Sequence, residues 1–141
     1  MSPRPSRRGA ISDFLLGQVT THSRDLVAHT AEHFGVSRQA IHRYVKELVA
    51  ANELQSDGRT RAAYALPSAE ARQVVETPSI EEDVLWQSMG APLVRFLPQN
   101  IRQIAQHGFT EMVNNVRDHS QSPIAHIELI RTPAMLKIGV L

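Results

Sequence analysis

One stretch of the chain carries side chains whose types and spacing could do chemistry together. Residues 109–120 read FTEMVNNVRDHS. If this stretch is helical, Glu111, Asn115 and His119 follow one another at intervals of four residues and share one face. A carboxylate, an amide and an imidazole in one row can hold a hydrated metal ion and a phosphate, and they can equally form a solvated surface. The apolar residues fall on another face, which we expect to be buried: Met112, Val113 and Val116.

Composition and charge indicate two modules. The chain has 141 residues and 42% hydrophobic content, enough for one ordinary domain or two small ones. The net charge of +1 is unevenly placed. Residues 1–66 hold nine Lys/Arg against six Asp/Glu, whereas residues 67–141 hold six against eight. A basic N-terminal half favours a polyanion as the partner of the first module.

Cysteine content and hydropathy indicate the cellular compartment in which we expect the protein. There is no cysteine, which excludes disulfides and thiolate metal sites and fits a reducing cytoplasm. The N-terminus, MSPRPSRRG, is basic but has no apolar run behind it, so it lacks the pattern of a signal peptide. No apolar stretch approaches the roughly 18 residues that a membrane span needs. We therefore expect a soluble, cytoplasmic protein with no membrane partner.

The sequence of the N-terminal half predicts a flexible arm followed by three helices. Residues 1–10, rich in Arg, Pro and Ser, are expected to form a flexible basic arm, either a solvated tail or a DNA-contacting one. Helices are expected over residues 11–21, beginning near Ser12, and over residues 23–34, ending at Gly35. Ser37 is a natural N-cap for a third helix.

The third helix, residues 38–51, has a buried face and a polar face. Ile41, Val45, Leu48 and Val49 are expected to face inward. Arginine suits guanine, glutamine suits adenine, and lysine neutralises phosphate. The polar face therefore predicts contacts with double-stranded DNA. The residues expected to make these contacts are the N-cap and five residues of this face: Ser37, Arg38, Gln39, His42, Arg43 and Lys46.

A hairpin is expected after the third helix. Asp57-Gly58 separates two extended runs, a strong hairpin signal, and Arg59 and Arg61 follow at its tip. Ala62, Tyr64 and Leu66 are expected to alternate inward. Residues 11–66 resemble the winged helix-turn-helix family, because three helices, the third of them basic, are followed by an arginine-tipped hairpin. The resemblance implies that Arg59 and Arg61 also contact DNA.

The second helix contains a pattern associated with zinc. His29-Thr-Ala-Glu32-His33 fits H-x-x-E-H, a metalloprotease arrangement. Such a site needs a third protein ligand and a cleft, and here the pattern lies on one of three short packed helices. We therefore expect no zinc, and we interpret these histidines as exposed or half-buried.

The second half predicts helices followed by strands. Residues 67–79 are expected to be a linker, and a helix should open at Ile80. Residues 99–120 form one long helical candidate whose apolar positions include Ile101, Ile104 and Phe109. Residues 124–131 and 135–141 read as strands, the second nearly all apolar and therefore buried. The whole chain is expected to be α+β.

The motif at residues 109–120 resembles the N box of the histidine-kinase-like (GHKL, or Bergerat) ATPase superfamily. With the winged helix, it resembles bacterial regulators that join the two domains, so residues 80–141 would be the N-terminal part of such an ATPase domain. The resemblance implies that Asn115 binds the Mg²⁺ of Mg-ATP and that Glu111 is the catalytic acid. It places His119 near the phosphates, whereas Asn114 matches the narrower group and is a candidate for nucleotide contact.

The family's next motif is missing from the chain. D-x-G-x-G, whose aspartate contacts adenine, should follow the second strand, and the printed sequence stops at Leu141. No P-loop and no glycine-rich lid replaces it. We therefore expect a fragment or a truncated form, in which Mg-ATP binding is weak or absent and hydrolysis is not expected.

Three functions follow from these features. The first is a DNA-binding transcriptional regulator with an incomplete nucleotide-sensing domain. The second is an ATP-binding GHKL ATPase or protein-kinase regulator, active only in a longer parent. The third is an interaction module without DNA binding, in which residues 80–141 form a dimer surface. A homodimer is expected from the resemblance alone.

Overall fold

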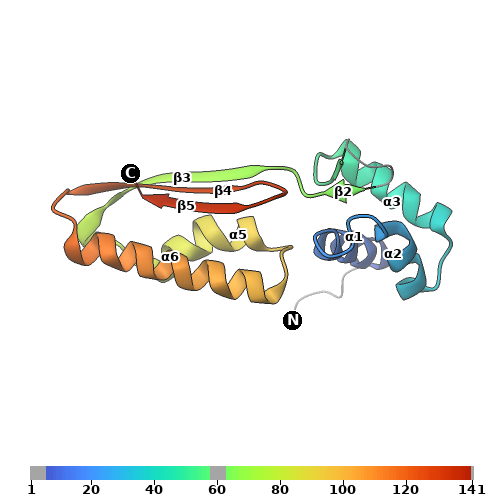
Figure 1. Cartoon of the computed structure of the whole chain (residues 1–141), viewed down its shortest axis with the longest axis horizontal. Helices are drawn as coiled ribbons and strands as arrows, with labels where there is room; N and C mark the ends of the chain where they lie inside the picture. The colour runs from blue at the N-terminus through green and yellow to red at the C-terminus, as the bar shows by residue number, and fades with distance from the viewer. Residues whose placement is uncertain (1–5, 58–62, 141) are drawn as a thin grey trace. The chain divides into compact units, whose positions relative to one another are not determined.

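The computed structural model describes residues 6–57 and 63–140. It confirms an α+β protein with helices and two small antiparallel sheets. The chain divides into two compact units, Met1–Pro67 and Ser68–Leu141. Each unit has its own hydrophobic core and is described separately below (Figure 1).

The first unit begins with a helix that starts earlier than expected. Helix α1 spans Arg7–Gln18, because the side chain of Ser6 accepts a hydrogen bond from the backbone N–H of Gly9 (3.1 Å) and caps it. The predicted flexible arm over residues 1–10 is therefore wrong for residues 7–10, and residues 1–5 lie outside the described part. Ser12, the expected start, lies inside the helix.

Helices α2 and α3 are joined by the tight turn that the sequence predicts. Helix α2 spans Leu26–Phe34, three residues shorter at its start than expected, and α3 spans Arg38–Ala50. Gly35 ends α2 in the left-handed conformation, with φ of 64°, which a residue without Cβ adopts at little cost. The Ser37 hydroxyl accepts a hydrogen bond from the Ala40 N–H (3.1 Å), confirming the predicted N-cap.

The core of the first unit combines the three helices with a short hairpin. Strand β1, Gln55–Ser56, pairs with β2, Tyr64–Ala65, which confirms the predicted hairpin, but Ser56 lies opposite Tyr64, so the connection is longer than the two residues Asp57-Gly58. Val49, expected inside, is 40% exposed, so the inner face of α3 is narrower than predicted. Tyr64 is only half-buried, and Ala62 lies outside the described residues. The buried side chains include Ile11, Leu15, Leu26, Ile41, Val45, Leu54 and Ala63.

The second unit starts with a strand where a linker was expected. Residues 69–76 form β3, Ala69–Glu76, and only Thr77–Ser79 forms a single 3₁₀ turn, η1. The linker prediction over residues 67–79 is therefore wrong. The strand pairs along its whole length with β4, Ile124–Arg131, from Glu76 opposite Ile124 to Ala69 opposite Arg131, so its partner strand lies far away in the sequence.

The three-stranded sheet has the order β3-β4-β5, with β5 spanning Leu136–Val140. The middle strand carries the fully buried residues Ala125, Ile127 and Leu129. Strand β5 lies at the edge and is at most half-buried, so the prediction that it is buried is wrong. An apolar run has the same sequence pattern in a central strand and in an edge strand. Only the order in which the strands pair distinguishes the two positions.

Helices cover one face of this sheet (Figure 1). Helix α4, Glu82–Leu85, continues into a π-helical turn, η2, Trp86–Gly90, and then into α5, Ala91–Val94. The indole of Trp86 is 4% exposed and lies 5.4 Å from the Phe109 ring, centroid to centroid. A Cβ on Gly90 would overlap that indole, so the close packing of the π turn requires glycine there.

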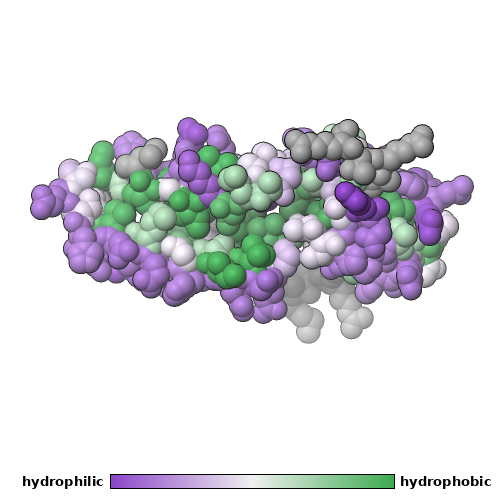
Figure 2. Space-filling view, in the orientation of Figure 1, coloured by the Kyte–Doolittle hydropathy of each residue, from purple (hydrophilic) through white to green (hydrophobic). Residues whose placement is uncertain are grey.

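Helix α6, Gln99–His119, confirms the long helix predicted from the sequence. Ala105, Phe109 and Val113 form its buried stripe, whereas Ile104, another of the apolar positions in the predicted helix, is 68% exposed. Ile101 is also exposed, so the first turns of α6 contribute little to the core. Figure 2 shows the outer surface of α6 as predominantly hydrophilic.

Candidate nucleic-acid interface and the polar face of α6

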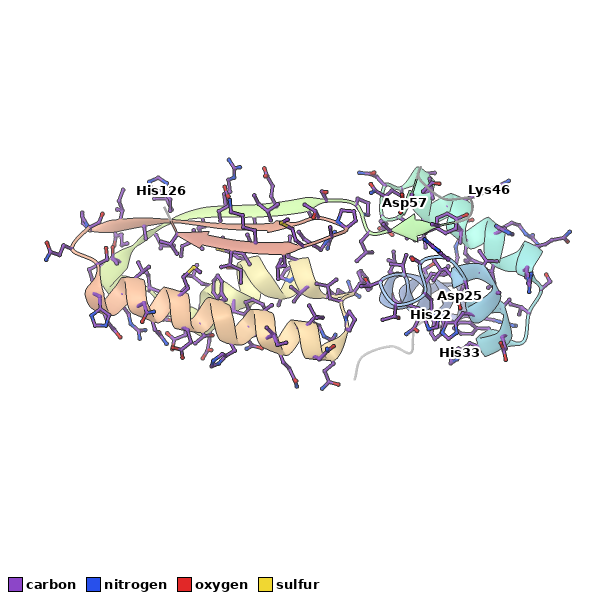
Figure 3. The ribbon with its side chains drawn as sticks, in the orientation of Figure 1. His22, Asp25, His33, Lys46, Asp57 and His126 are labelled. Carbon is purple, nitrogen blue, oxygen red and sulfur yellow. The ribbon has the colours of Figure 1, made fainter. Side chains whose placement is uncertain are left out.

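The outer face of α3 is polar, exposed and mostly basic. All the residues that the sequence assigned to DNA contact on this helix are exposed, namely Ser37, Arg38, Gln39, His42, Arg43 and Lys46. Figure 3 shows Lys46 on the side of α3 turned away from α1 and α2. The helix therefore presents one face to solvent while Ile41, Val45 and Leu48 anchor the opposite face in the core.

Helical spacing arranges these side chains in two adjacent rows. Arg38, His42 and Lys46 follow at intervals of four residues, and Gln39 and Arg43 form the neighbouring row. Within the α3 segment the only acidic residue is Glu47, which continues the second row four residues after Arg43. The two rows therefore combine three cations with an amide, an imidazole and one carboxylate.

Glu47 is occupied by a cation from another helix. Its carboxylate accepts a hydrogen bond from Arg8 Nη2 at 2.6 Å, which joins the start of α1 to the end of α3. A shallow hollow beside this ion pair is lined by Arg8, Ala40, Arg43, Tyr44 and Glu47. The pairing reduces the negative field of Glu47 within the second row and places Arg8 beside Arg43. Sequence reasoning missed Arg8 as a neighbour of α3, because no local pattern connects the two helices.

The two arginines predicted at the tip of the hairpin, Arg59 and Arg61, lie outside the described residues. The strands that lead to them, β1 and β2, are paired as expected. The described part of the candidate interface therefore consists of α3 with Arg8.

The polar face of α6 carries the N-box residues. Glu111, Asn115 and His119 are exposed along one side of the helix, as their spacing predicts. Asn114 differs, because it is half-buried and its side-chain oxygen accepts a hydrogen bond from Arg117 Nη2 at 2.8 Å. The structure therefore brings Glu111, Asn115 and His119 together and separates Asn114 from them.

Arg117 ties the end of α6 to α4. Its guanidinium donates to the carboxylate of Glu82 at 2.8 Å, to the backbone carbonyl of Ile80 at 3.4 Å and to Asp118 at 3.3 Å. The hydrogen bond from its own backbone amide, and then the one from Arg117, hold the pKa of Glu82 below its ordinary value. Hydrogen bonds to Asp118 and Glu82 raise the pKa of Arg117. The spacing of Asn114 and Arg117, three residues apart on one helix, was the sequence signal for this network.

The histidines of the zinc-like pattern form a stack of rings. His33 lies on the Phe14 ring with centroids 4.1 Å apart, and His29 lies on His22 at 3.7 Å. His29 Nε2 also contacts the side-chain oxygen of Gln18 at 3.2 Å. Within the described residues, no three His, Asp or Glu side chains are grouped so that they could hold a metal ion. Figure 3 shows His22, Asp25 and His33 beside α1 and α2.

Asp25 completes this cluster. Its carboxylate oxygens lie 3.1 Å from His22 Nδ1, just before the first residue of α2. The hydrogen bond with His22 lowers the pKa of Asp25. The cluster is accounted for by ring packing and two polar contacts, His22 with Asp25 and His29 with Gln18.

Comparison with known protein families found none that matches the chain, and comparison with curated proteins and with solved structures also found no match. Among the helices of the described residues, none has the length and apolar content needed to cross a membrane. The functional argument therefore depends on the geometry of the two surfaces described above.

Proposed function

We propose that the protein is a DNA-binding transcriptional regulator that reads double-stranded DNA with α3. The observation that carries the proposal is the pair of exposed rows on α3, which contain three cations and a single acid, Glu47, that is itself paired with Arg8. The helix follows a tight turn and is capped by Ser37, the arrangement that places a recognition helix in the major groove.

The residue types on α3 support both kinds of contact that a DNA reader needs. Arg38 and Gln39 lie in the first turn, the part of a recognition helix that approaches base edges. Arg43 and Lys46 lie further along and suit phosphates, which fix register without reading sequence. Arg8, beside Arg43, extends the positive surface onto α1.

The test is the affinity for duplex DNA as a function of salt. Each phosphate contact contributes about −0.9 to the slope of log K against log salt concentration. Replacing both Arg43 and Lys46 by alanine should make the slope shallower by roughly two and weaken binding to every sequence. Arg38→Ala should instead reduce the preference for the specific site, at a cost of about 1–3 kcal/mol.

The control removes the same charge from the second unit. Arg95 and Arg102 are exposed there, and replacing both by alanine changes the net charge by the same amount. The proposal requires the α3 variants to lose far more affinity than this control. Equal losses would show that binding follows net charge alone, and unchanged binding in the α3 variants would exclude α3 as the contact surface.

A second function, Mg-ATP binding by the second unit, is favoured by the polar face of α6. Glu111, Asn115 and His119 are exposed on one side of one helix. Mg²⁺ takes oxygen ligands and keeps several waters, so the Asn115 amide oxygen together with phosphate oxygens is an adequate set. Glu111 would position water, and His119 would lie near the phosphates. Asn114 is not assigned to the nucleotide, because Arg117 occupies its oxygen.

Calorimetric titration with Mg-ATP tests this second function. Heat of binding that Asn115→Ala abolishes would support it. The matched control is Asn100→Ala, which removes an exposed amide from the same helix, outside the motif, and should leave the heat unchanged. Absence of heat with the wild-type chain, or equal loss in the two variants, would count against Asn115 as the ligand.

A further inference from the structure

Strand β3 has an open edge beside an exposed apolar patch. The sheet order β3-β4-β5 places β4 on one side of β3, and the described residues contain no strand on the other side (Figure 1). A hollow runs beside this edge, lined by residues of β3 and of α4 that include Val74 and Val84. Val74 is 57% exposed and Val84 is 61% exposed. The edge therefore offers unpaired backbone groups next to apolar side chains, a combination that invites another strand.

The outward side chains of β3 carry charges in an order that lets the strand pair with a reversed copy of itself. Ala69, Ala71 and Val75 pack against the core, so the alternate residues face outward. The last three of these are Arg72, Val74 and Glu76, that is, a cation, an apolar residue and an anion in sequence. When such a strand is reversed and laid beside a copy of itself, opposite charges face each other on both sides of the apolar residue.

We propose that two copies of this chain pair through β3, antiparallel, about a two-fold axis at Val74. In this register Val74 faces the partner's Val74, Arg72 faces the partner's Glu76, and Glu76 faces the partner's Arg72. Directly opposed residues in an antiparallel pair interact most strongly, and opposite charges there are favourable. The two sheets become one six-stranded sheet, and the same patch serves both copies, as a two-fold interface requires.

The existing contacts of Arg72 are compatible with this pairing. Its Nε donates to Glu128 at 2.9 Å on the neighbouring strand, and Nη2 lies 3.5 Å from Glu70. A guanidinium has five N–H donors, so it can hold Glu128 of its own chain and receive a second carboxylate. Its side chain remains 63% exposed. Strand β5, at the other edge, carries Lys137 and no acidic residue, so it has no equivalent self-complementary order.

A cysteine cross-link tests the register directly. The chain has no cysteine, so Val74→Cys introduces its only thiol. In the proposed register the two introduced thiols lie directly opposite, at a Cβ separation of about 4.5–5.5 Å, which needs only a small adjustment to form a disulfide. We expect mild oxidation to give a covalent dimer of Val74→Cys and much less of Glu70→Cys, an exposed position on the same strand outside the register. Equal cross-linking at the two positions would overturn the proposal.

Charge reversal tests the same pairing without a covalent bond. Sedimentation equilibrium of the wild-type chain should show a dimer. Glu76→Arg and Arg72→Glu should each raise the dimer dissociation constant by roughly tenfold or more, because two attractive pairs become repulsive. An equal mixture of the two variants should regain the dimer, since every facing pair is then opposite in charge. A monomeric wild-type chain, or a dimer that Glu76→Arg leaves intact, would overturn the proposal.

The fold control uses the fluorescence of Trp86, the only tryptophan, which is buried in the core of the same unit. Unchanged emission in each variant shows that loss of the dimer does not arise from unfolding. For Arg72→Glu this control is essential, because that substitution also places two carboxylates beside each other at Glu128.

Discussion

Replacing Gly90 by alanine should displace Trp86 and destabilise the second unit. An ideal Cβ at Gly90 would lie 2.9 Å from Trp86 Cδ2 and closer still to Cε3 and Cζ3, and the indole ring has no flexible end that can yield. If the ring shifts within the core, overpacking costs about 1–3 kcal/mol. If the ring leaves the core, about 200 Å² of apolar surface returns to water, which costs roughly 5 kcal/mol.

These costs are large for a unit of this size. A unit of 74 residues, Ser68–Leu141, has a free energy of unfolding of roughly 4–11 kcal/mol. Gly90→Ala should therefore remove a large share of it. The assay is urea unfolding followed by the fluorescence of Trp86, which reports both stability and the environment of the displaced ring. We expect a lower midpoint and emission at longer wavelength in the native baseline.

Gly108→Ala is the matched control. It makes the same chemical change in the same unit, but its Cβ would have no heavy atom within 4 Å. Because alanine is the better helix former, Gly108→Ala should raise the free energy of unfolding, by up to about 1 kcal/mol. If Gly90→Ala keeps buried emission and loses less than about 0.5 kcal/mol, the steric reasoning for the π turn is refuted.

Three further predictions concern caps, core and pH. Ser37→Ala should lower the stability of the first unit by about 1 kcal/mol, since the Ala40 N–H loses its acceptor. Thermal unfolding followed by circular dichroism measures this loss. Ser37→Asp should retain the cap and therefore the stability. Phe109→Ala should cost about 3–5 kcal/mol, because the ring is fully buried in the core beside Trp86; a loss below 1 kcal/mol in urea unfolding would contradict this. Glu82 has a lowered pKa in the folded state, so its stabilising effect is complete above the ordinary glutamate pKa and is lost as the pH falls through the folded pKa. Urea unfolding between neutral and acidic pH should therefore show a weaker acid dependence for Glu82→Gln than for the wild type, and parallel curves would show that the ion pair with Arg117 contributes nothing.

The sequence predicted the helices with strong local signals. Ser37 and Gly35 marked the start of α3 and the end of α2, because capping and left-handed backbone are properties of single residues. The apolar spacing of Phe109 and Val113 was enough to predict α6. In each case the information lies within a few neighbouring residues.

Strand β3 was missed because its signal depends on a distant partner. Its inward positions are two alanines, Gln73 and Val75, so the alternation with Glu70 and Arg72 is weak in hydrophobicity, and flanking prolines and serines suggested a linker. Only pairing with β4 makes the segment a strand. Likewise, the apolar run at residues 136–140 could not reveal that β5 lies at an edge.

The candidate sites show the same difference between features set by neighbouring residues and features set by distant ones. Exposure of the α3 residues and of Glu111, Asn115 and His119 followed from periodicity within one helix. The engagement of Asn114 by Arg117, and of Glu47 by Arg8, depends partly on side chains from other helices. A residue type at a plausible spacing therefore predicts where a side chain points better than it predicts whether its polar atoms are free.

Helix α6 is held unevenly along its length. Its first buried residue is Ala105, six residues after Gln99, and Pro98 supplies no side-chain cap. The opposite end is fastened by the guanidinium of Arg117 to α4. Local opening should therefore begin at the Gln99 end, where backbone amides should exchange with solvent faster than those around Val113. Glu111 and Asn115 lie in the half that stays closed, so their mutual spacing persists while the other half frays.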